Sequence, residues 1–227
     1  MRSLKLKYVI LIIAAIIFVD QALKIWIKTS YQIGDTNVSG LPWFRLHFIE
    51  NSGMAWGWKF GNETGKMILT LFRLAAVIFG TWYLGRLVKK KYNRGFIICA
   101  ALIYAGALGN LIDSMFYGMI FDRGYHFDPA VGEYVDQHYA GIAQMFTGDS
   151  YSSFLHGSVV DMLYFPLFKI NDFEFFSAIF NISDASISVG VITLLLFQKK
   201  FFKKHSKEEP QPTIETSTDV SDKVQVS

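Results

Sequence analysis

The sequence predicts an all-α membrane protein with four transmembrane helices, a small β-rich platform and a long loop outside the membrane. Two observations support this fold class. Of the 227 residues, 52% are apolar, and they gather in four long runs instead of being spread along the chain. An apolar run of about 20 residues spans the hydrocarbon layer of a bilayer as a helix. Clusters of lysine and arginine also alternate with segments that lack them, which is typical of chains that cross a membrane several times.

The first apolar run predicts a helix over residues 8–28. Its basic flank, with Lys5 and Lys7, resembles the start of a secretory signal peptide. However, the segment from Asp20 to Lys24 is not a small-residue cleavage site, and the helical pattern continues beyond it, so we expect the helix to be retained. Asp20 and Lys24 lie four residues apart and therefore share a helix face, where they can form an ion pair.

Short strands are expected in the mixed segment 29–65. Apolar and polar residues alternate over 44–49, and large aromatic residues alternate with other residues over 56–60, which is the period of a β-strand. The small residues that follow Asn51 fit either a tight backbone beside a ligand or an ordinary turn between strands.

Three further apolar runs predict helices over residues 66–88, 95–113 and 177–198, and Arg73 lies within the first of them. The segment 114–176 is polar and contains eight acidic residues against one arginine and one lysine. It predicts a long loop whose aromatic residues form either an interfacial lid or a small core outside the membrane.

The distribution of positive charge predicts the topology. Basic clusters precede the first helix, join the second to the third and follow the fourth, and such clusters stay in the cytoplasm. Residues 1–204 are therefore expected to form one membrane domain with both termini in the cytoplasm and with residues 29–65 and 114–176 outside. Residues 205–227 lack periodicity and predict a disordered cytoplasmic tail. This topology brings four carboxylates to one depth near the outer ends of the helices: Asp20, Asp113, Asp161 and Asp184.

Two asparagine–aspartate pairs share the same spacing. Asn110 precedes Asp113 by three residues, and Asn181 precedes Asp184 by three, so on a helix each asparagine would lie on the face of its aspartate. Either pair alone is compatible with simple capping of a helix end. Two pairs at one depth, together with Asp161, favour a functional cleft in which the amides orient carboxylates or hold a substrate backbone.

Two carboxylates that approach each other at the membrane surface predict acid–base chemistry. Repulsion between like charges and partial loss of water would leave one proton shared between Asp161 and Asp184. The ionised member can then take a proton from water while the protonated member polarises a peptide carbonyl. The spacing alone does not choose this pair over one that includes Asp113.

No metal or other cofactor is expected, and neither is nucleic acid as a partner. The sequence contains no HExxH, CxxC, GxSxG or Walker pattern. The loop histidines His126, His138 and His156 match no common metal-binding spacing, and Cys99 lies inside an apolar run.

Five stretches, taken in order, resemble the lipoprotein signal peptidase family, also called signal peptidase II. They are Asp20-Gln21-x-x-Lys24, Asn51-x-Gly53-x-Ala55-Trp56-Gly57, Gly106-Ala107-Leu108-Gly109-Asn110-Leu111-Ile112-Asp113, Val159-Val160-Asp161, and Phe180-Asn181-x-x-Asp184 with Gly190 beyond.

The resemblance implies an aspartic endopeptidase of the bacterial inner membrane. Members of this family remove the signal peptide from prolipoproteins by cutting before a cysteine that carries diacylglycerol, and the cyclic peptide globomycin inhibits them. The family's catalytic pair corresponds to Asp161 and Asp184. The resemblance implies substrate-binding or supporting roles for a further group of residues: Asn51, Asn110, Asp113, Asn181, Asp20, Lys24 and Gly109. We expect a monomer surrounded by membrane lipids, with the platform, the loop and the active site on the periplasmic side.

Three features depart from the family pattern. Ser114 stands where the family usually has arginine after the Gly-Asn-x-x-Asp motif, and Arg123 is a candidate to replace that cation. Ser183 stands where alanine is usual. The connection from 119 to 157 is much longer than the family's, so it is expected either to cover the cleft or to be a neutral insertion.

A non-enzymatic alternative is a small transporter or proton relay that uses carboxylates within the membrane. It predicts polar residues spread through the membrane depth and helices broken near the midplane. In this sequence the carboxylates gather near one side, which favours the peptidase.

Overall fold

A computed structural model describes most of the chain. It covers residues 4–38, 41, 43–51, 63–125, 127–128, 130, 133–134, 139–166, 168–170, 173–175 and 177–202. The expected strand over 56–60, the tail over 205–227 and the histidines at 126 and 138 lie outside these residues.

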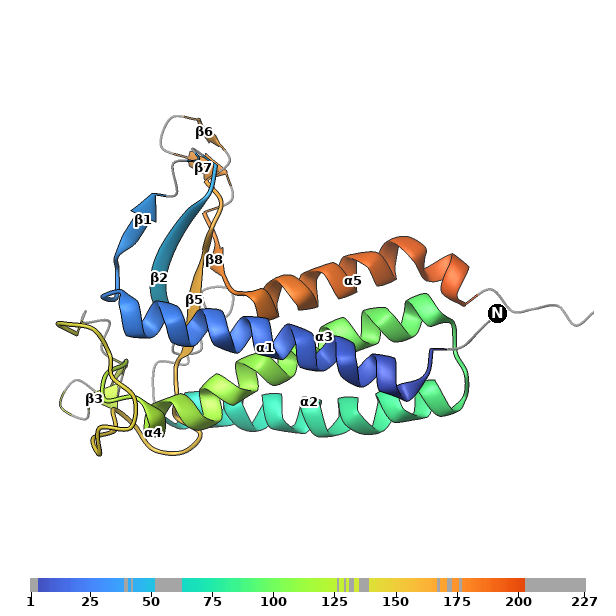
Figure 1. Ribbon diagram of the computed structural model, residues 1–227, viewed down its shortest axis with the longest axis horizontal. Coiled ribbons are helices and arrows are strands. Elements are labelled where there is room, and N and C mark those ends of the chain that lie inside the picture. Colours follow the sequence, from blue (N-terminus) through green and yellow to red (C-terminus); the bar gives the residue numbers. More distant parts are fainter. Residues whose placement is uncertain are drawn as a thin grey trace, which may run out of the picture.

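In the part of the chain that the structure describes, four long helices lie side by side and form the body of the molecule (Figure 1). They are α1 (Leu6–Ser30), α2 (Glu63–Lys89), α3 (Arg94–Ile112) and α5 (Ile182–Phe201). All four are long and apolar enough to cross a membrane. Large apolar side chains point outward from them, including Phe18, Phe72 and Leu196, each at least 70% exposed. The four predicted helices are therefore present among the described residues, and their length and composition fit a membrane protein.

The sequence predicted that the third helix ends at Asp113, but in the structure it continues. It continues through a π-helical turn, η1 (Asp113–Tyr117), into the short α4 (Gly118–Ile120). The prediction treated residues 114–176 as one polar loop, but the first acidic residue of this segment is Asp122. The residues before it are largely apolar, and Tyr117 is buried, so packing extends the helix. The Ser114 hydroxyl donates to the Asn110 carbonyl at 3.0 Å, within the widened turn.

The last helix begins at Ile182 and not at residue 177. Ile179 and Phe180 form strand β8 instead, and they pair with strand β5 (Val159–Tyr164). Asn181 then starts the helix, because its side chain accepts a hydrogen bond from the backbone N–H of Asp184 at 2.8 Å. A strand that joins directly to a capped helix holds Asp184 close to the sheet.

A four-stranded antiparallel sheet stands at one end of the helix bundle (Figure 1). Its order is β1 (Thr36–Val38), β2 (Arg45–Asn51), β5 and β8. The alternation over 44–49 is thus confirmed as part of strand β2. Strand β5 lies in the interior of the sheet, and Asp161 on it is opposite Ile49 of β2. Two small hairpins accompany the sheet: β3 (Phe127–Asp128) with β4 (Glu133–Tyr134), and β6 (Phe168–Ile170) with β7 (Phe173–Phe175).

The long connection between α4 and β5 forms part of a small core outside the helix bundle. Tyr125 and Ala143 from this connection pack with Phe48 of β2 and with Val160 and Met162 of β5. Beside this core, Glu50 is buried and accepts hydrogen bonds from Lys28, Tyr139 and the Tyr125 backbone N–H. The described part of the connection is therefore a packed layer joined to α1 and β2. Of the two expectations for its aromatic residues, the packed core is the one observed.

Glycines allow α3 and α5 to pack closely beside the sheet. A Cβ atom at Gly106 would lie 2.2 Å from the Ser183 carbonyl oxygen, and one at Gly109 would lie 2.1 Å from the Ser183 Oγ. Either contact would push α5 away, since real Cβ atoms do not approach so closely. The two glycines thus set the position of Asn110 relative to the start of α5.

Candidate active site

A buried lysine joins two carboxylates where α1 crosses α3. The Lys24 Nζ lies 2.9 Å from Asp20 and 2.8 Å from Asp113, and all three side chains are fully buried. The ion pair expected between Asp20 and Lys24 is therefore present. An ammonium group deep in a protein is tolerated only when it is paired and hydrogen-bonded, so these residues act as one structural unit.

Further hydrogen bonds extend this unit to the other elements of the site. Asp20 accepts a hydrogen bond from the Ser183 N–H at the start of α5, at 2.9 Å. Gln21 donates to Asp113 at 2.8 Å, and the Val160 N–H of β5 lies 3.4 Å from the other oxygen of Asp113. Asp113 and Asp20 thus hold the sheet and the last helix against α1 and α3.

Asn110 and Asn181 bridge the remaining two aspartates. Asn110 donates to Asp184 at 2.7 Å, and Asn181 donates to Asp161 at 2.6 Å. The two amides also contact each other, because the Asn181 Nδ2 lies 3.1 Å from the Asn110 Oδ1. The Lys24 Nζ donates to the same Asn110 oxygen at 3.0 Å. Asp161 and Asp184 are therefore held by one continuous chain of hydrogen bonds that is anchored on Lys24.

The side-chain amides of both asparagines donate to aspartates other than those that their spacing predicted, although Asn181 also exchanges capping hydrogen bonds with Asp184. The prediction placed Asn110 with Asp113 and Asn181 with Asp184 on a shared helix face. In the structure Asn110 reaches across to Asp184 on another helix, and Asn181 precedes its helix instead of lying within it. Asn181 caps α5, as the capping interpretation predicted, and its amide also donates to Asp161.

Asp161 and Asp184 differ in their surroundings. Asp161 is only 3% exposed, whereas Asp184 is partly exposed. Burial, and next the nearby charge of Asp184, raise the pKa of Asp161 to about 8. Asp161 therefore keeps its proton at neutral pH, which is the state expected for one member of a pair that shares a proton.

The cation that meets Ser114 comes from α2. Arg73 donates to the Ser114 hydroxyl at 2.9 Å, and its positive charge acts on Asp113, Asp184 and Asp161. The expectation that Arg123 replaces the family's usual arginine is wrong. Arg123 lies in the layer outside the bundle, where it pairs with Asp122 and donates to the Ala140 carbonyl. The available signal for Arg73 was its position as a lone charge inside an apolar run.

Asn51 lies farther along the sheet than the other candidate residues. It ends strand β2 and is opposite Val159, two residues before Asp161 on the paired strand. It therefore lies beside the strand that carries Asp161. The other residues of its sequence motif are outside those that the structure describes.

These observations define the class of protein: a multi-pass membrane protein in which two aspartates, one buried and one partly exposed, are bridged by asparagines at one end of the helices. The family model for signal peptidase II matches residues 12–200. Since this match covers most of the chain, the protein belongs to the signal peptidase II family and is a protease.

Named relatives agree with the family match. The chain is 38% identical over 230 residues to the lipoprotein signal peptidase of Porphyromonas gingivalis, covering 91% of this chain and 94% of the relative. It is 30% identical to that of Amoebophilus asiaticus, covering 91% and 81%.

Two solved structures of bacterial membrane enzymes share the fold. One has a TM-score of 0.55 at 27% identity and covers 92% of this chain and 99% of its own. The other has a TM-score of 0.53 at 25% identity and covers 88% and 98%.

Proposed function

We propose that this protein is an aspartic endopeptidase that removes the signal peptide from diacylglyceryl-modified prolipoproteins, by cleaving before the lipidated cysteine. Membership of the signal peptidase II family supports the substrate class. The observation that carries the proposal is the bridge of Asn110 and Asn181 between Asp161 and Asp184. It holds two carboxylates with different burial in one site.

In the proposed reaction Asp184 is the base and Asp161 the acid. Asp184 takes a proton from a water molecule, whose oxygen attacks the scissile carbonyl carbon, while Asp161 gives its proton to the carbonyl oxygen. The resulting diol then collapses. Asp184 returns its proton to the departing nitrogen as the C–N bond breaks, and Asp161 recovers a proton from the diol. The products are a carboxylic acid and the free amine of the cysteine, and both aspartates regain their starting states.

The assignment of acid and base rests on burial. The high pKa of Asp161 favours the protonated form of the more enclosed carboxyl, whereas Asp184 has access to water. The side-chain amide of Asn181 donates to one oxygen of Asp161. Asp184 accepts hydrogen bonds on both oxygens, from the Asn110 amide and, at 3.5 Å, from the Asn181 backbone N–H, and these bonds fix the orientation of its carboxylate.

We propose that Arg73 is a positioning residue in this site. Its bond to Ser114 ties α2 to the π-helical turn, one residue after Asp113. Its charge also offsets part of the repulsion among Asp113, Asp161 and Asp184. On this view the arginine has moved from the position of Ser114 to the facing helix.

The membrane placement follows from the distribution of charge. Basic clusters lie at the end of the bundle away from the sheet, and such clusters favour the cytoplasm, so we infer that this end is cytoplasmic. The sheet and the site then lie in the periplasm, near the outer leaflet. A lipid-modified substrate can approach sideways from the bilayer, so its acyl chains stay in apolar surroundings while the peptide reaches Asp161 and Asp184.

Cleavage of a defined substrate tests the proposed function. We expect the purified full-length protein to cut a diacylglyceryl-modified prolipoprotein before the modified cysteine, and globomycin to block the reaction. The same precursor without the lipid is the control and should remain uncut. The new N-terminus is identified by mass spectrometry. If well-folded protein leaves the modified substrate intact, the proposal fails and the transporter alternative gains support.

The rate of cleavage should depend on the proton held by Asp161. Because the pKa of this carboxyl is raised to about 8, it is protonated below that pH and ionised above it. The reaction needs one proton on the pair, so we expect kcat/KM to fall about tenfold per pH unit above pH 8. A profile of kcat/KM against pH, measured in detergent, tests this fall at high pH. A rate that stays constant up to pH 10 would contradict the role of Asp161 as the acid.

A further inference from the structure

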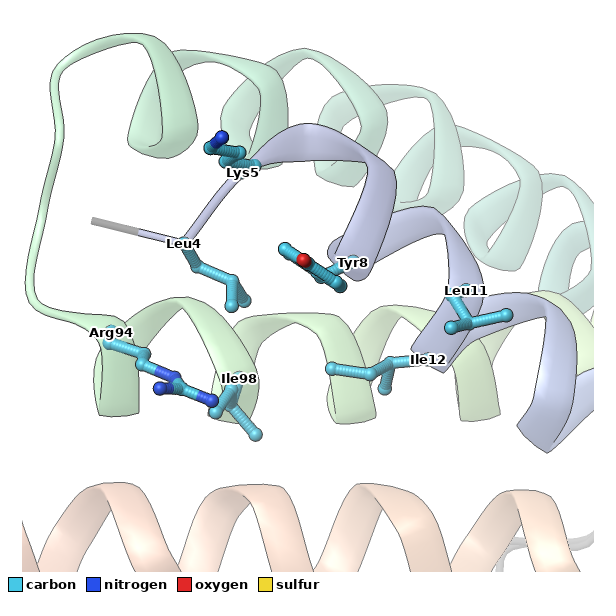
Figure 2. Close-up of a pocket in the computed structure, with 7 residues that line it drawn as sticks. All are labelled: Leu4, Lys5, Tyr8, Leu11, Ile12, Arg94 and Ile98. Carbon is cyan, nitrogen blue, oxygen red and sulfur yellow. The ribbon is translucent and has the colours of Figure 1, made fainter. Parts of the chain in front are cut away.

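The end of the helix bundle away from Asp161 and Asp184 carries a cavity between the first turns of α1 and α3. Its volume is about 860 Å³, and Figure 2 shows the side chains that line it. Lys5, Tyr8, Leu11 and Ile12 come from the α1 side, and Arg94 and Ile98 come from α3. A volume of roughly 300–1,000 Å³ is typical of pockets that hold a ligand.

The lining changes from charged to apolar along the cavity. Lys5 and Arg94 lie toward the end where both helices begin, and Leu11 and Ile12 lie farther along α1 (Figure 2). Neither cation forms a hydrogen bond or ion pair with another residue that the structure describes. Tyr8 lies between the two regions, and the Lys7 Nζ lies 5.2 Å from the centre of its ring. The lining thus carries positive charge only at the end where the helices begin, beside Leu4 and Ile98, and it is apolar farther along α1.

The surroundings favour an anionic ligand. The described segments 4–19, 64–112 and 185–202 contain no aspartate or glutamate. In contrast, the helix ends around the cavity carry nine basic residues: Lys5, Lys7, Arg86, Lys89, Lys90, Lys91, Arg94, Lys199 and Lys200.

The cavity also opens toward the lipid-facing side of the bundle. Leu11 is 64% exposed and Tyr8 is 47% exposed, and both lie on a helix long and apolar enough to span a bilayer. A ligand in the cavity would therefore contact water or headgroups at its charged end and hydrocarbon at its apolar end. Only an amphipathic molecule satisfies both ends.

We propose that this cavity is a binding site for an anionic phospholipid. Arg94 binds the phosphate from the α3 side, Lys5 adds positive charge at the start of α1, Tyr8 lies at the level of the glycerol, and an acyl chain packs along Leu11, Ile12 and Ile98. A free phosphate ion would leave the apolar wall unused, and a zwitterionic lipid would gain less from the two cations. The site is separate from the peptidase site, since Arg94 and Asn110 lie about 24 Å apart along α3. It therefore does not depend on the proposed function.

Lipid titration of the full-length protein tests this site. The protein in neutral detergent receives dioleoyl-phosphatidylglycerol or dioleoyl-phosphatidylcholine, and native mass spectrometry counts the lipids that stay bound. We expect one phosphatidylglycerol to bind at a concentration at least about tenfold lower than phosphatidylcholine, since each nearby cation contributes roughly fivefold toward an anionic lipid. Glycerol 3-phosphate, which has the charge without the chains, should not displace it.

Matched variants separate the cavity from the general positive charge. Lys5→Gln with Arg94→Gln should abolish the preference for phosphatidylglycerol. Lys89→Gln with Lys90→Gln removes the same charge from exposed positions outside the cavity. This double variant should change the preference for phosphatidylglycerol less than about twofold. Ile98→Trp fills the apolar wall, keeps both cations and should weaken binding. Equal loss in both double variants, displacement by glycerol 3-phosphate, or no lipid retained by the wild type would each overturn the proposal.

Discussion

Asp161→Asn and Asp184→Asn are each expected to reduce cleavage of a lipid-modified prolipoprotein by about 10²- to 10⁴-fold while leaving the fold intact. Loss of a general acid or base has an effect of this size. Asparagine has nearly the same shape as aspartate, and its amide oxygen can still accept the hydrogen bonds from Asn181 and Asn110. The substitutions therefore remove proton transfer and leave most of the contacts that hold the site.

The rate of single-turnover cleavage is measured for each variant, and its thermal unfolding is measured to check that the fold is kept. Asp149→Asn is the matched control, because Asp149 is an exposed carboxylate in the outer layer and lies away from the bridge of asparagines. It should cleave at the wild-type rate. If either active-site variant cleaves at a near-normal rate, the two-aspartate mechanism is wrong, whatever the substrate.

Arg73→Gln is expected to lower kcat/KM by roughly 10- to 100-fold, since a small displacement of a catalytic group can reduce the rate by about 10²-fold. The variant breaks the bond to Ser114 and removes a positive charge that acts on Asp161 and Asp184. Arg73→Lys keeps the charge and should retain more activity. Arg86→Gln removes an arginine from the far end of the same helix and should have little effect.

Two further results distinguish an electrostatic role for Arg73 from a purely structural one. Without the cation, ionised Asp161 is less favourable, so its pKa should rise and the falling limb of the pH–rate profile should move to higher pH. Ser114→Arg in the Arg73→Gln background returns an arginine to the facing helix and should restore part of the activity. No shift of the limb and no recovery would show that Arg73 merely supports packing.

Local patterns in the sequence were sufficient for much of the fold. Hydrophobic runs predict helices because a helix in a bilayer must satisfy its own backbone and present apolar side chains to lipid. The alternation of apolar and polar residues over 44–49 predicts strand β2, since neighbouring side chains of a strand face opposite sides of the sheet. The spacing of Asp20 and Lys24 also predicts their contact, because both lie on one helix.

The limits of each element depended on contacts that no local pattern contains. Residues 177–180 are apolar enough to extend α5, yet Ile179 and Phe180 pair with strand β5. Likewise, Tyr117 belongs to a segment that looked like loop, and its burial against the sheet extends the third helix. The outer connection became a packed layer because its aromatic residues meet β2 and β5.

What the sequence by itself determined was most of the groups in the candidate site, although not Arg73, and the end of the bundle at which they gather. The four carboxylates and two asparagines could be predicted to lie near one depth from hydropathy and charge alone. Only the tertiary structure decided which groups meet: Asn110 with Asp184, Asn181 with Asp161, and Arg73 with Ser114. Each of these contacts joins residues of different elements, and its partner is chosen by how closely those elements pack. Gly106 and Gly109 show this directly, since the absence of two side chains sets where α5 begins relative to α3.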